Sequence, residues 1–182
     1  EALEGLFNEA DKAFADGYNV LILSDRGVDK DNISIPSLLA VSSLHHHLVR
    51  KGARTSLALI LESGEPREIH HFATLLGFGA SAINPYLAYE SIRELIEEEL
   101  LEIPYEKGVY NFNKAILKGI VKILSKMGIS TIQSYQGAQI FEALGIADKV
   151  IDKYFTNTIS RIGGIEIKDI QKEAELRHAT YV

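Results

Sequence analysis

The sequence predicts an α/β fold: a partial, rudimentary (β/α) barrel-like domain with a mainly parallel sheet, spanning residues 1–182 as a single domain. Two observations predict this fold class. Short apolar runs of strand-like composition alternate with segments of helical periodicity, as is typical of parallel sheets. The chain has 182 residues, 46% of them hydrophobic, which suffices for a core but falls short of the roughly 250 residues of a complete barrel.

The first third of the chain predicts a helix, a strand and a second helix, at residues 2–16, 18–23 and 36–51. Gly17 and Gly52 end the two helices, because glycine readily adopts the left-handed conformation found after a helix C-terminus. The strand has few polar positions, as expected of a strand covered on both faces. Pro36 suits the start of the second helix.

The middle of the chain predicts two more strand–helix units, with strands at 56–61 and 80–83 and helices at 66–76 and 86–101. Pro104 and Gly108 bracket a connection to a long helix. That helix covers roughly 112–126, and Gly128 ends it. This repeated order resembles the last two units of a barrel, where two loops can hold a phosphate.

The carboxyl-terminal part is less regular. Ile129–Ser134 predicts a fourth short strand, and Gly137–Leu144 predicts the helix after it. The remaining elements are a segment near 147–155, a polar loop at 156–158, the stretch Ser160–Gly164 and a helix from about Lys168. Four strand–helix units would form half of a barrel.

Composition excludes several classes of function. The formal net charge of −6 argues against general attraction to nucleic acid or to anionic membranes. Without cysteine, the chain has no disulfide, thiolate zinc site, cysteine-ligated iron–sulfur cluster or cysteine nucleophile. No apolar run has the length of a membrane span and the amino terminus does not resemble a signal peptide, so a cytoplasmic location is expected.

Polar residues follow the predicted strands, where functional sites of α/β proteins collect. Asp25 and Arg26 follow the first strand, and a loop-locking ion pair between them is the simpler interpretation of this pair. Glu62 and Asn84 follow the next two strands. We expect Ser24–Arg26, Glu62–Gly64, Asn84 and Ser134–Gly137 to share one rim of the sheet. Arg161, ahead of two glycines, is a separate candidate.

The two loops do not have the chemistry of a phosphate site. Glu62 and Glu65 would repel a phosphate, and Pro85 removes one backbone donor at the start of a helix. Asn84 then has the position of an ordinary N-cap. Two structural turns are therefore favoured over a phosphate site.

Three consecutive histidines, His45, His46 and His47, suggest a metal site at first sight. Neighbouring residues on a helix diverge by about 100°, so the three rings cannot converge on one ion. A packed, hydrogen-bonded His45 between two surface histidines is the better interpretation, and the same objection applies to His70 and His71.

Four lysines at i+4 spacing form a basic stripe on the long helix: Lys114, Lys118, Lys122 and Lys126. The preceding helix and loop carry glutamates at positions 90, 94, 97, 98, 99 and 102. A solvated face or two complementary helices is one interpretation, and a docking stripe for another domain is equally supported. Nucleic-acid binding is a distant third, because aromatic residues do not interleave the lysines.

Four stretches of this sequence resemble the central domain of the glutamate synthase large subunit. They are ILSDRGVDKDNISIPSLLAVSSLHHHLVRKG, ESGEPREIHHFATLLGFGASAINPYLAYE, KGIVKILSKMGISTIQSYQGAQIFEALGI and DKYFTNTISRIGGI. Together they cover most of the chain from about Tyr18 to Ile165.

The resemblance implies a role within a larger enzyme. In that family a glutaminase domain releases ammonia with an amino-terminal cysteine, and ammonia travels through a tunnel to an FMN-bearing (β/α)₈ domain with an iron–sulfur cluster. That domain joins ammonia to 2-oxoglutarate. The central domain links the two and is a rudimentary copy of the FMN barrel. The resemblance thus implies a non-catalytic scaffold with no cofactor of its own; the alternative is a stand-alone flavin- or phosphate-binding domain derived from a barrel.

The departures from the family pattern are also informative. The glutaminase nucleophile, the cluster cysteines, the FMN barrel and the first half of the usual central domain are absent, so we expect either an excised piece or a stand-alone descendant. Gln136 stands where the family pattern suggests arginine. Candidate rim or interdomain residues are Asp25, Arg26, Glu62, Asn84, Lys118, Lys122, Lys126, Tyr135 and Arg161.

An incomplete barrel should leave edges and apolar faces open. The partners implied by the resemblance are the glutaminase and FMN-binding domains, and we expect them to contact such surfaces. The lysine stripe and Ser134–Phe141 are the candidates for the surface that meets the FMN-binding domain. In the isolated chain the same surface predicts a two-fold homodimer.

Overall fold

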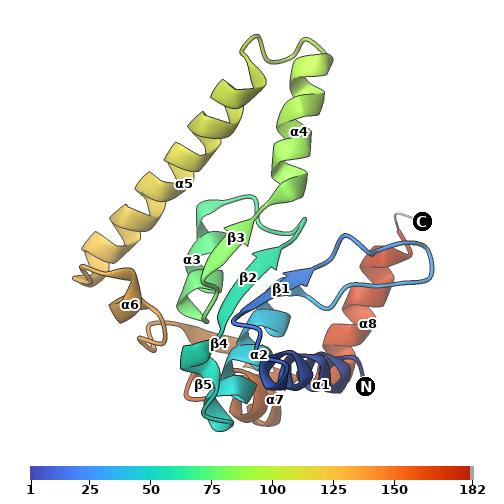
Figure 1. Ribbon diagram of the computed structural model, residues 1–182, viewed down its shortest axis with the longest axis vertical. Helices are drawn as coiled ribbons and strands as arrows, with labels where there is room; N and C mark the ends of the chain where they lie inside the picture. Colours follow the sequence, from blue (N-terminus) through green and yellow to red (C-terminus); the bar gives the residue numbers. More distant parts are fainter. Residues whose placement is uncertain (181–182) are drawn as a thin grey trace.

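The computed structural model describes residues 1–180 and contains two small parallel sheets among helices (Figure 1). The elements of the first sheet and its surroundings are α1 (Ala2–Ala15), β1 (Val20–Ser24), α2 (Ser37–Arg50), η1 (Arg54–Ser56), β2 (Ala58–Glu62), α3 (Ile69–Gly77) and β3 (Ala82–Asn84). The later elements are α4 (Tyr86–Glu97), α5 (Tyr105–Met127), α6 (Ile132–Tyr135), β4 (Glu142–Ile146), α7 (Asp148–Tyr154), β5 (Ile159–Ile165) and α8 (Ile167–His178).

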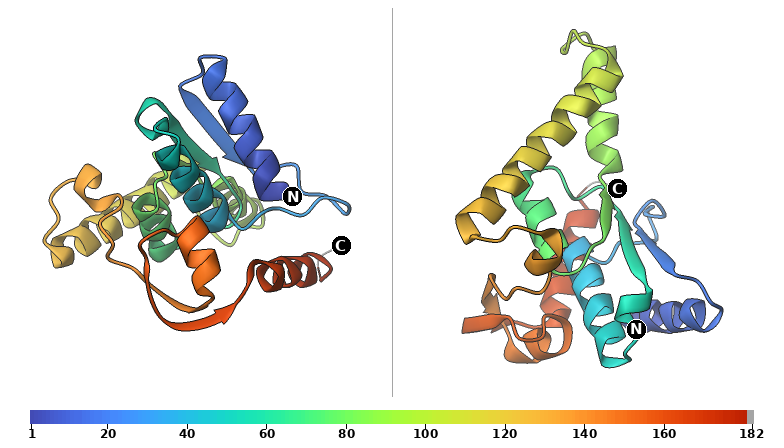
Figure 2. Two further views of the ribbon diagram at one scale, coloured as in Figure 1. Left: turned by 90° about the horizontal axis from the view of Figure 1, so that it is seen from below. Right: turned by 60° about the vertical axis from the view of Figure 1, so that its left-hand side comes forward.

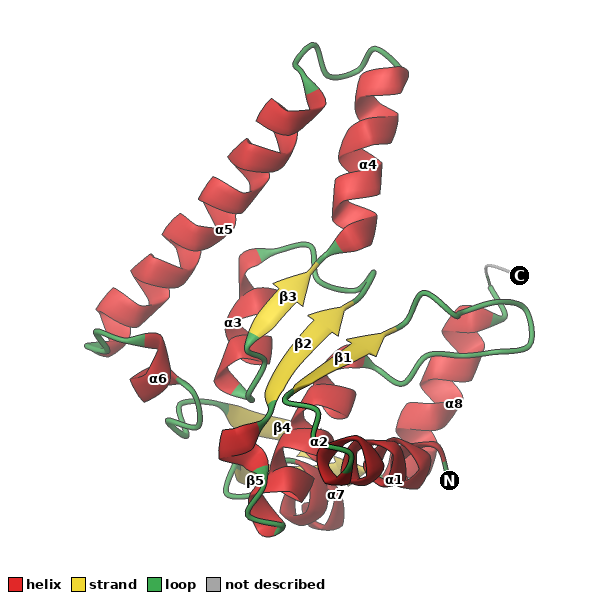
Figure 3. Cartoon of the chain, in the orientation of Figure 1, coloured by secondary structure: helices red, strands yellow, loops and turns green. Residues whose placement is uncertain are grey.

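The first sheet has its strands in chain order, β1–β2–β3, and all of them are parallel. Leu23, Leu61 and Ile83 stand in one register row and pack against α2 and α3, which therefore cover the same face. The opposite face is open, with Ile22 63% exposed (Figure 3). Sequential parallel strands with their helices on one side are the arrangement of a (β/α) barrel. Within residues 1–180 the barrel does not close, so the expected partial α/β fold is confirmed.

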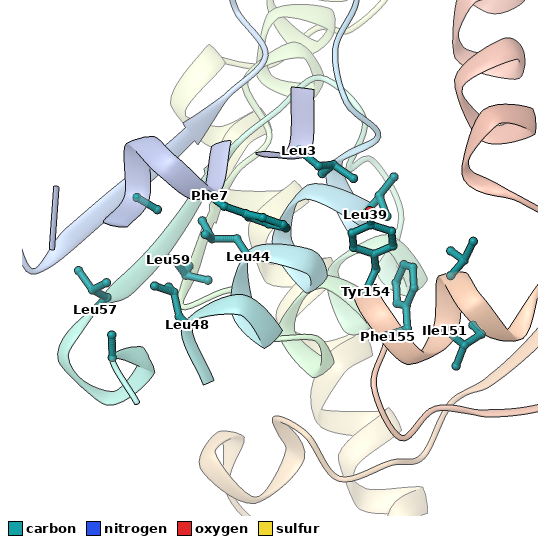
Figure 4. Packing of buried hydrophobic residues seen from close by; sticks show 13 residues of the cluster. Leu3, Phe7, Leu39, Leu44, Leu48, Leu57, Leu59, Ile151, Tyr154 and Phe155 are labelled. Carbon is teal, nitrogen blue, oxygen red and sulfur yellow. The ribbon is translucent and has the colours of Figure 1, made fainter. Parts of the chain in front are cut away.

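The main core lies between α1, α2, β2 and α7 (Figure 4). Leu44, Leu48 and Leu59 are completely buried there, and Phe7 of α1 and Tyr154 of α7 pack around them. Burying side chains of this size contributes about 1.5–3 kcal/mol each. This cluster joins the amino-terminal helix to α7, near the other end of the chain.

Helices α4 and α5 form a hairpin that projects away from the sheets (Figure 2). The long helix begins at Tyr105, seven residues earlier than expected, because Gly108 is a helical residue and not part of a connection. A Cβ atom at Gly108 would lie 2.7 Å from Ile92 of α4, so glycine permits close packing of the two helices. Gly119 similarly packs on Ile69 of α3, where a Cβ atom would lie 2.5 Å away.

Two predictions for the carboxyl-terminal part are wrong. The expected strand Ile129–Ser134 instead contains the short helix α6, whose first turn is capped by Thr131 accepting a hydrogen bond from the Ser134 amide. The expected helix Gly137–Leu144 gives way to strand β4, which pairs in parallel with β5. The pairing is irregular, and Gly164 lies directly against the Gly145 carbonyl, where no side chain would fit.

Candidate functional site

Three predicted residues meet at the carboxyl ends of the first sheet. Ser24, Glu62 and Asn84 lie in one register row across β1, β2 and β3. The Glu62 carboxylate accepts hydrogen bonds from Ser24 Oγ at 2.8 Å and from Asn84 Nδ2 at 3.1 Å. The common rim expected for the first three strand ends is confirmed. The expected N-cap role of Asn84 is wrong, since Pro85 holds that position in α4.

Arg26 completes this cluster from the loop after β1. Its Nε atom lies 2.9 Å from Glu62 Oε1, and its guanidinium stacks 4.0 Å from the centre of the Tyr86 ring. A second carboxylate, that of Glu90, lies 3.5 Å from Nη1. The hydrogen bonds from Arg26 and Ser24 lower the pKa of Glu62 below its ordinary value. The expected ion pair between Asp25 and Arg26 is wrong, because Arg26 pairs with the two glutamates.

Asp25 forms hydrogen bonds with the loop after β2. Its carboxylate accepts hydrogen bonds from Ser63 Oγ at 2.6 Å and from the Gly64 amide at 3.1 Å. These bonds fasten the loop after β1 to the loop after β2. Burial, followed by the nearby Asp25 carboxylate, raises the pKa of Tyr86 to about 12. The tyrosine therefore stays protonated at neutral pH.

Glu65 lies at the amino terminus of α2, where an external anion would otherwise be favoured. Its Oε2 atom accepts hydrogen bonds from the Ser37 amide at 2.8 Å and from Ser37 Oγ at 2.5 Å. A shallow cavity of about 300 Å³ lies beside these groups, lined by Asp25, Asn32, Ser34 and Ser37 among others. The negative charge that a phosphate would bring is thus already supplied by the protein's own side chain.

Tyr135 and its neighbours lie elsewhere than expected. Tyr135 is completely buried and donates a hydrogen bond to the Ala73 carbonyl at 3.1 Å. The side-chain amide of Gln136 binds the Ala80 carbonyl ahead of β3, and the Gly137 amide binds the Gly77 carbonyl. This segment therefore packs at the amino end of β3. Its expected place on the carboxyl rim is wrong, and Tyr135 is a core residue without the surface that an interdomain contact needs.

The remaining predicted residues are solvent-exposed and lie on elements outside the first sheet. Lys118, Lys122 and Lys126 lie on α5. Across the described part of the chain, none of them forms an ion pair with a glutamate of α4. Arg161 of β5 lies 3.5 Å from Glu142 of β4, an exposed pair of little energetic weight. Whether these residues contact another domain stays a prediction.

The histidine cluster on α2 is structural. His45 Nδ1 accepts a hydrogen bond from Arg54 Nε at 2.9 Å, as expected for a packed histidine. Burial, with the Arg54 charge as the next cause, lowers the pKa of His45 to about 4. The surface position expected for His46 and His47 is wrong, because both are half-buried. His47 stacks on Phe7 and pairs with Asp11 at 2.9 Å.

Two further properties concern residues 1–180 as a whole. They contain no group of three histidine, aspartate or glutamate side chains placed to hold a metal ion. Nor is any helix in this range both long and apolar enough to cross a membrane.

Sequence reasoning missed three residues that complete the rim. Glu65 belongs to the turn after β2, and Tyr86 and Glu90 to the first turns of α4. Ser63 lies on the rim, as expected for the residues that follow β2, and donates a hydrogen bond to Asp25. For Tyr86 and Glu90 the signal was their i+4 spacing on a helix that starts at the same rim.

Comparison with known proteins gives a consistent result. The family model described as "Glutamate synthase central domain" matches residues 1–147. The chain is 54% identical over 176 residues to the large chain of the NADPH glutamate synthase of Bacillus subtilis, a match covering 97% of this chain and 12% of the relative. It is 46% identical to the NADH glutamate synthase of Schizosaccharomyces pombe, covering 97% and 8% respectively. The ferredoxin-dependent glutamate synthase of Pyropia yezoensis is 40% identical over 98% of this chain and 12% of its own length.

Proposed function

Because this chain belongs to the glutamate synthase central domain family, we propose that it is a non-catalytic connecting segment of a glutamate synthase large chain. It joins a glutaminase domain, which supplies ammonia, to an FMN-binding synthase domain, which adds the ammonia to 2-oxoglutarate. FMN and the iron–sulfur cluster belong to the adjoining domain. The chain spans about a tenth of the length of the relatives it matches, which leaves room in those relatives for both.

The observation that carries this proposal is that the polar side chains of the rim are bonded to one another. In a (β/α) barrel the carboxyl ends of the strands hold the reacting groups. Here Glu62 is bound by Ser24, Arg26 and Asn84, and Glu65 occupies the amino terminus of α2. The donors that would hold a substrate or a phosphate are engaged by the chain's own carboxylates. The rim therefore acts as an internal brace between loops, and this counts against a stand-alone flavin or phosphate binder.

A second observation supports a connecting role. Large apolar side chains are exposed on several elements, including Ile22 of β1, Leu117 of α5 and Leu144 of β4, each more than 60% exposed. Ile22 is accompanied by exposed Val20 on β1, and Leu117 by exposed Val121 on α5, and contiguous apolar surface of this kind marks contact sites in soluble proteins. A segment enclosed between two domains needs such surfaces more than it needs titrating groups.

The proposal is tested by exchanging segments. In the B. subtilis large chain, the segment that matches this chain is replaced by residues 1–182, and the ratio of glutamate formed to glutamine consumed is measured with the native electron donor. If the chain is a connecting segment, the chimera should fold, and glutamine hydrolysis and glutamate formation should remain coupled in it. A chimera that contains its flavin but releases free ammonia without forming glutamate would contradict the proposal.

A further inference from the structure

The outer edge of β1 has unpaired backbone groups. The Asn19 carbonyl accepts a hydrogen bond from the Ala58 amide, and the Asp25 amide donates to the Glu62 carbonyl. Backbone groups of a strand alternate in direction, so those of odd-numbered residues between these two positions face β2. The N–H and C=O groups of Val20, Ile22 and Ser24 therefore point to the other side. Among the strands of the described chain, none pairs with that side.

The same part of the chain exposes apolar side chains. Val20 is 44% exposed and Ile22 63%, and side-chain alternation along β1 places both on the sheet face opposite Leu21 and Leu23. Tyr18, just ahead of β1, is 64% exposed. Parallel sheets are normally covered on both faces, so this face lacks its usual neighbour. The backbone edge of β1 is separate from this face, and an unpaired strand edge is a site for strand addition. This edge lacks the lysines, prolines and bulges with which proteins protect edges.

Helix α1 indicates which strand belongs there. Its buried residues Leu3, Phe7 and Ala10 pack in the same core as α2, so α1 lies in the helix layer beside α2. It leads into β1 as α2 leads into β2 and α3 into β3. In such units the helix crosses over from a parallel neighbouring strand with right-handed sense. Phe14 near the end of α1 is 41% exposed, as expected of a helix that overhangs the sheet edge.

We infer that the outer edge of β1 binds a parallel β-strand from the segment that precedes α1 in the longer glutamate synthase polypeptide. The strand would have the length of β1, five residues, with aliphatic side chains beside Val20 and Ile22. This inference rests on the proposed function, because it places the chain inside a larger polypeptide. The relatives, of which this chain spans at most 12%, have polypeptide available for such a strand.

A fusion protein tests the inference directly. Roughly 20 residues that precede the matched segment in the B. subtilis large chain are joined ahead of Glu1, which allows a strand and a βα loop of the usual length. Hydrogen exchange of single amides is then measured by NMR. The Val20, Ile22 and Ser24 amides should exchange roughly 100-fold more slowly in the fusion than in residues 1–182 alone. The Leu21 and Leu23 amides, which face β2, should be protected equally in both.

The matched control is a fusion in which the added residues are scrambled. Unchanged exchange at Val20, Ile22 and Ser24 in the native-order fusion would overturn the inference, as would equal protection in the scrambled one. A second copy of the chain is the competing occupant. It would reveal itself as concentration-dependent protection of these amides in residues 1–182 alone, and that result would also overturn the inference.

A pair of proline variants gives a second readout. Ile22→Pro removes an amide that points to the free edge, where proline is tolerated, and should shift the Tm of residues 1–182 by less than about 4 °C. Leu21→Pro removes an amide bonded to β2 and should lower the Tm by roughly 6–12 °C. In the native-order fusion, Ile22→Pro should cancel the extra protection of Val20 and Ser24. Retained protection would contradict strand addition.

The outcomes separate the two proposals. If the segment-exchange chimera forms glutamate in a coupled reaction but the β1 edge is unprotected in the fusion, only the strand inference is contradicted. If the edge is protected but the chimera is uncoupled, only the proposed function is contradicted.

Discussion

Arg26 and Glu62 join two neighbouring loops of the first sheet, with Arg26 Nε 2.9 Å from Glu62 Oε1. Each residue comes from the carboxyl end of a different parallel strand, the position that collects reacting groups in (β/α) barrels. Here the two charged side chains form an ion pair with each other, and the Tyr86 ring stacks on the Arg26 guanidinium. The geometry of a barrel rim is kept while its groups serve to hold loops together.

Removal of the Glu65 carboxylate should weaken α2. Glu65→Ala leaves the Ser37 amide and hydroxyl without their acceptor, so we expect a loss of about 1 kcal/mol in the free energy of unfolding. Glu68→Ala is the matched control, since Glu68 precedes α3 without making a side-chain cap bond, and it should cost less than about 0.5 kcal/mol. Urea unfolding followed by circular dichroism measures both. Equal losses in the two variants would refute the capping role.

Stability should fall with acid because of His45. Its pKa is 6.5 when unfolded and about 4 in the fold, so the unfolded chain binds more protons between these values. The stabilising contribution is complete above pH 6.5 and is lost as the pH falls toward 4, by at most about 3 kcal/mol.

His45→Gln keeps an acceptor for Arg54 and should flatten this pH dependence, as measured by urea unfolding at pH values from 4 to 7. His70→Gln, at an exposed position, should leave it intact. An unchanged slope in His45→Gln would assign the acid sensitivity to other groups.

Two helical glycines should respond oppositely to alanine. A Cβ atom at Gly119 would lie 2.5 Å from Ile69, so Gly119→Ala should lower the free energy of unfolding by about 1–3 kcal/mol through displacement of α5 from α3. Gly5 of α1 has no described atom within 4 Å of its Cβ position, and Gly5→Ala should raise stability by about 0.5–1 kcal/mol. Thermal unfolding of both variants decides this. Stabilisation by Gly119→Ala would show that the α3–α5 contact accommodates the added Cβ atom.

The isolated chain should self-associate through α5. Tyr110, Leu117 and Val121 form an exposed apolar row beside the lysine stripe, each more than half exposed. Light scattering should therefore show a dimer that Leu117→Asp and Val121→Asp dissociate, because a buried unpaired charge is unfavourable. Leu176→Asp on α8, at similar exposure, should leave the dimer unchanged. A monomer at high protein concentration would count against this interface.

The sequence predicted the amino-terminal half of the fold better than the rest, and the reason is local. Strands β1 and β2 are continuous aliphatic runs that end in polar turns, so their position and the shared rim follow from short-range patterns. Strand β4 contains Glu142, Ala143 and Leu144, which favour helices, and it becomes a strand only by pairing with β5. That pairing depends on the contact of Gly145 with Gly164, which no local pattern reveals. Likewise, the partner of Arg26 is Glu62, from the next strand, rather than its neighbour Asp25.

We propose that this segment connects two active sites and catalyses nothing itself. The most direct test is made in the segment-exchange chimera with the rim disabled by Asp25→Asn and Glu62→Gln. Glutamine hydrolysis and reduction of the bound flavin are measured separately. We expect both half-reactions of the folded chimera to proceed at the rates of the unmodified chimera. Loss of either half-reaction in a chimera that remains folded would contradict the claim and make the rim part of an active site.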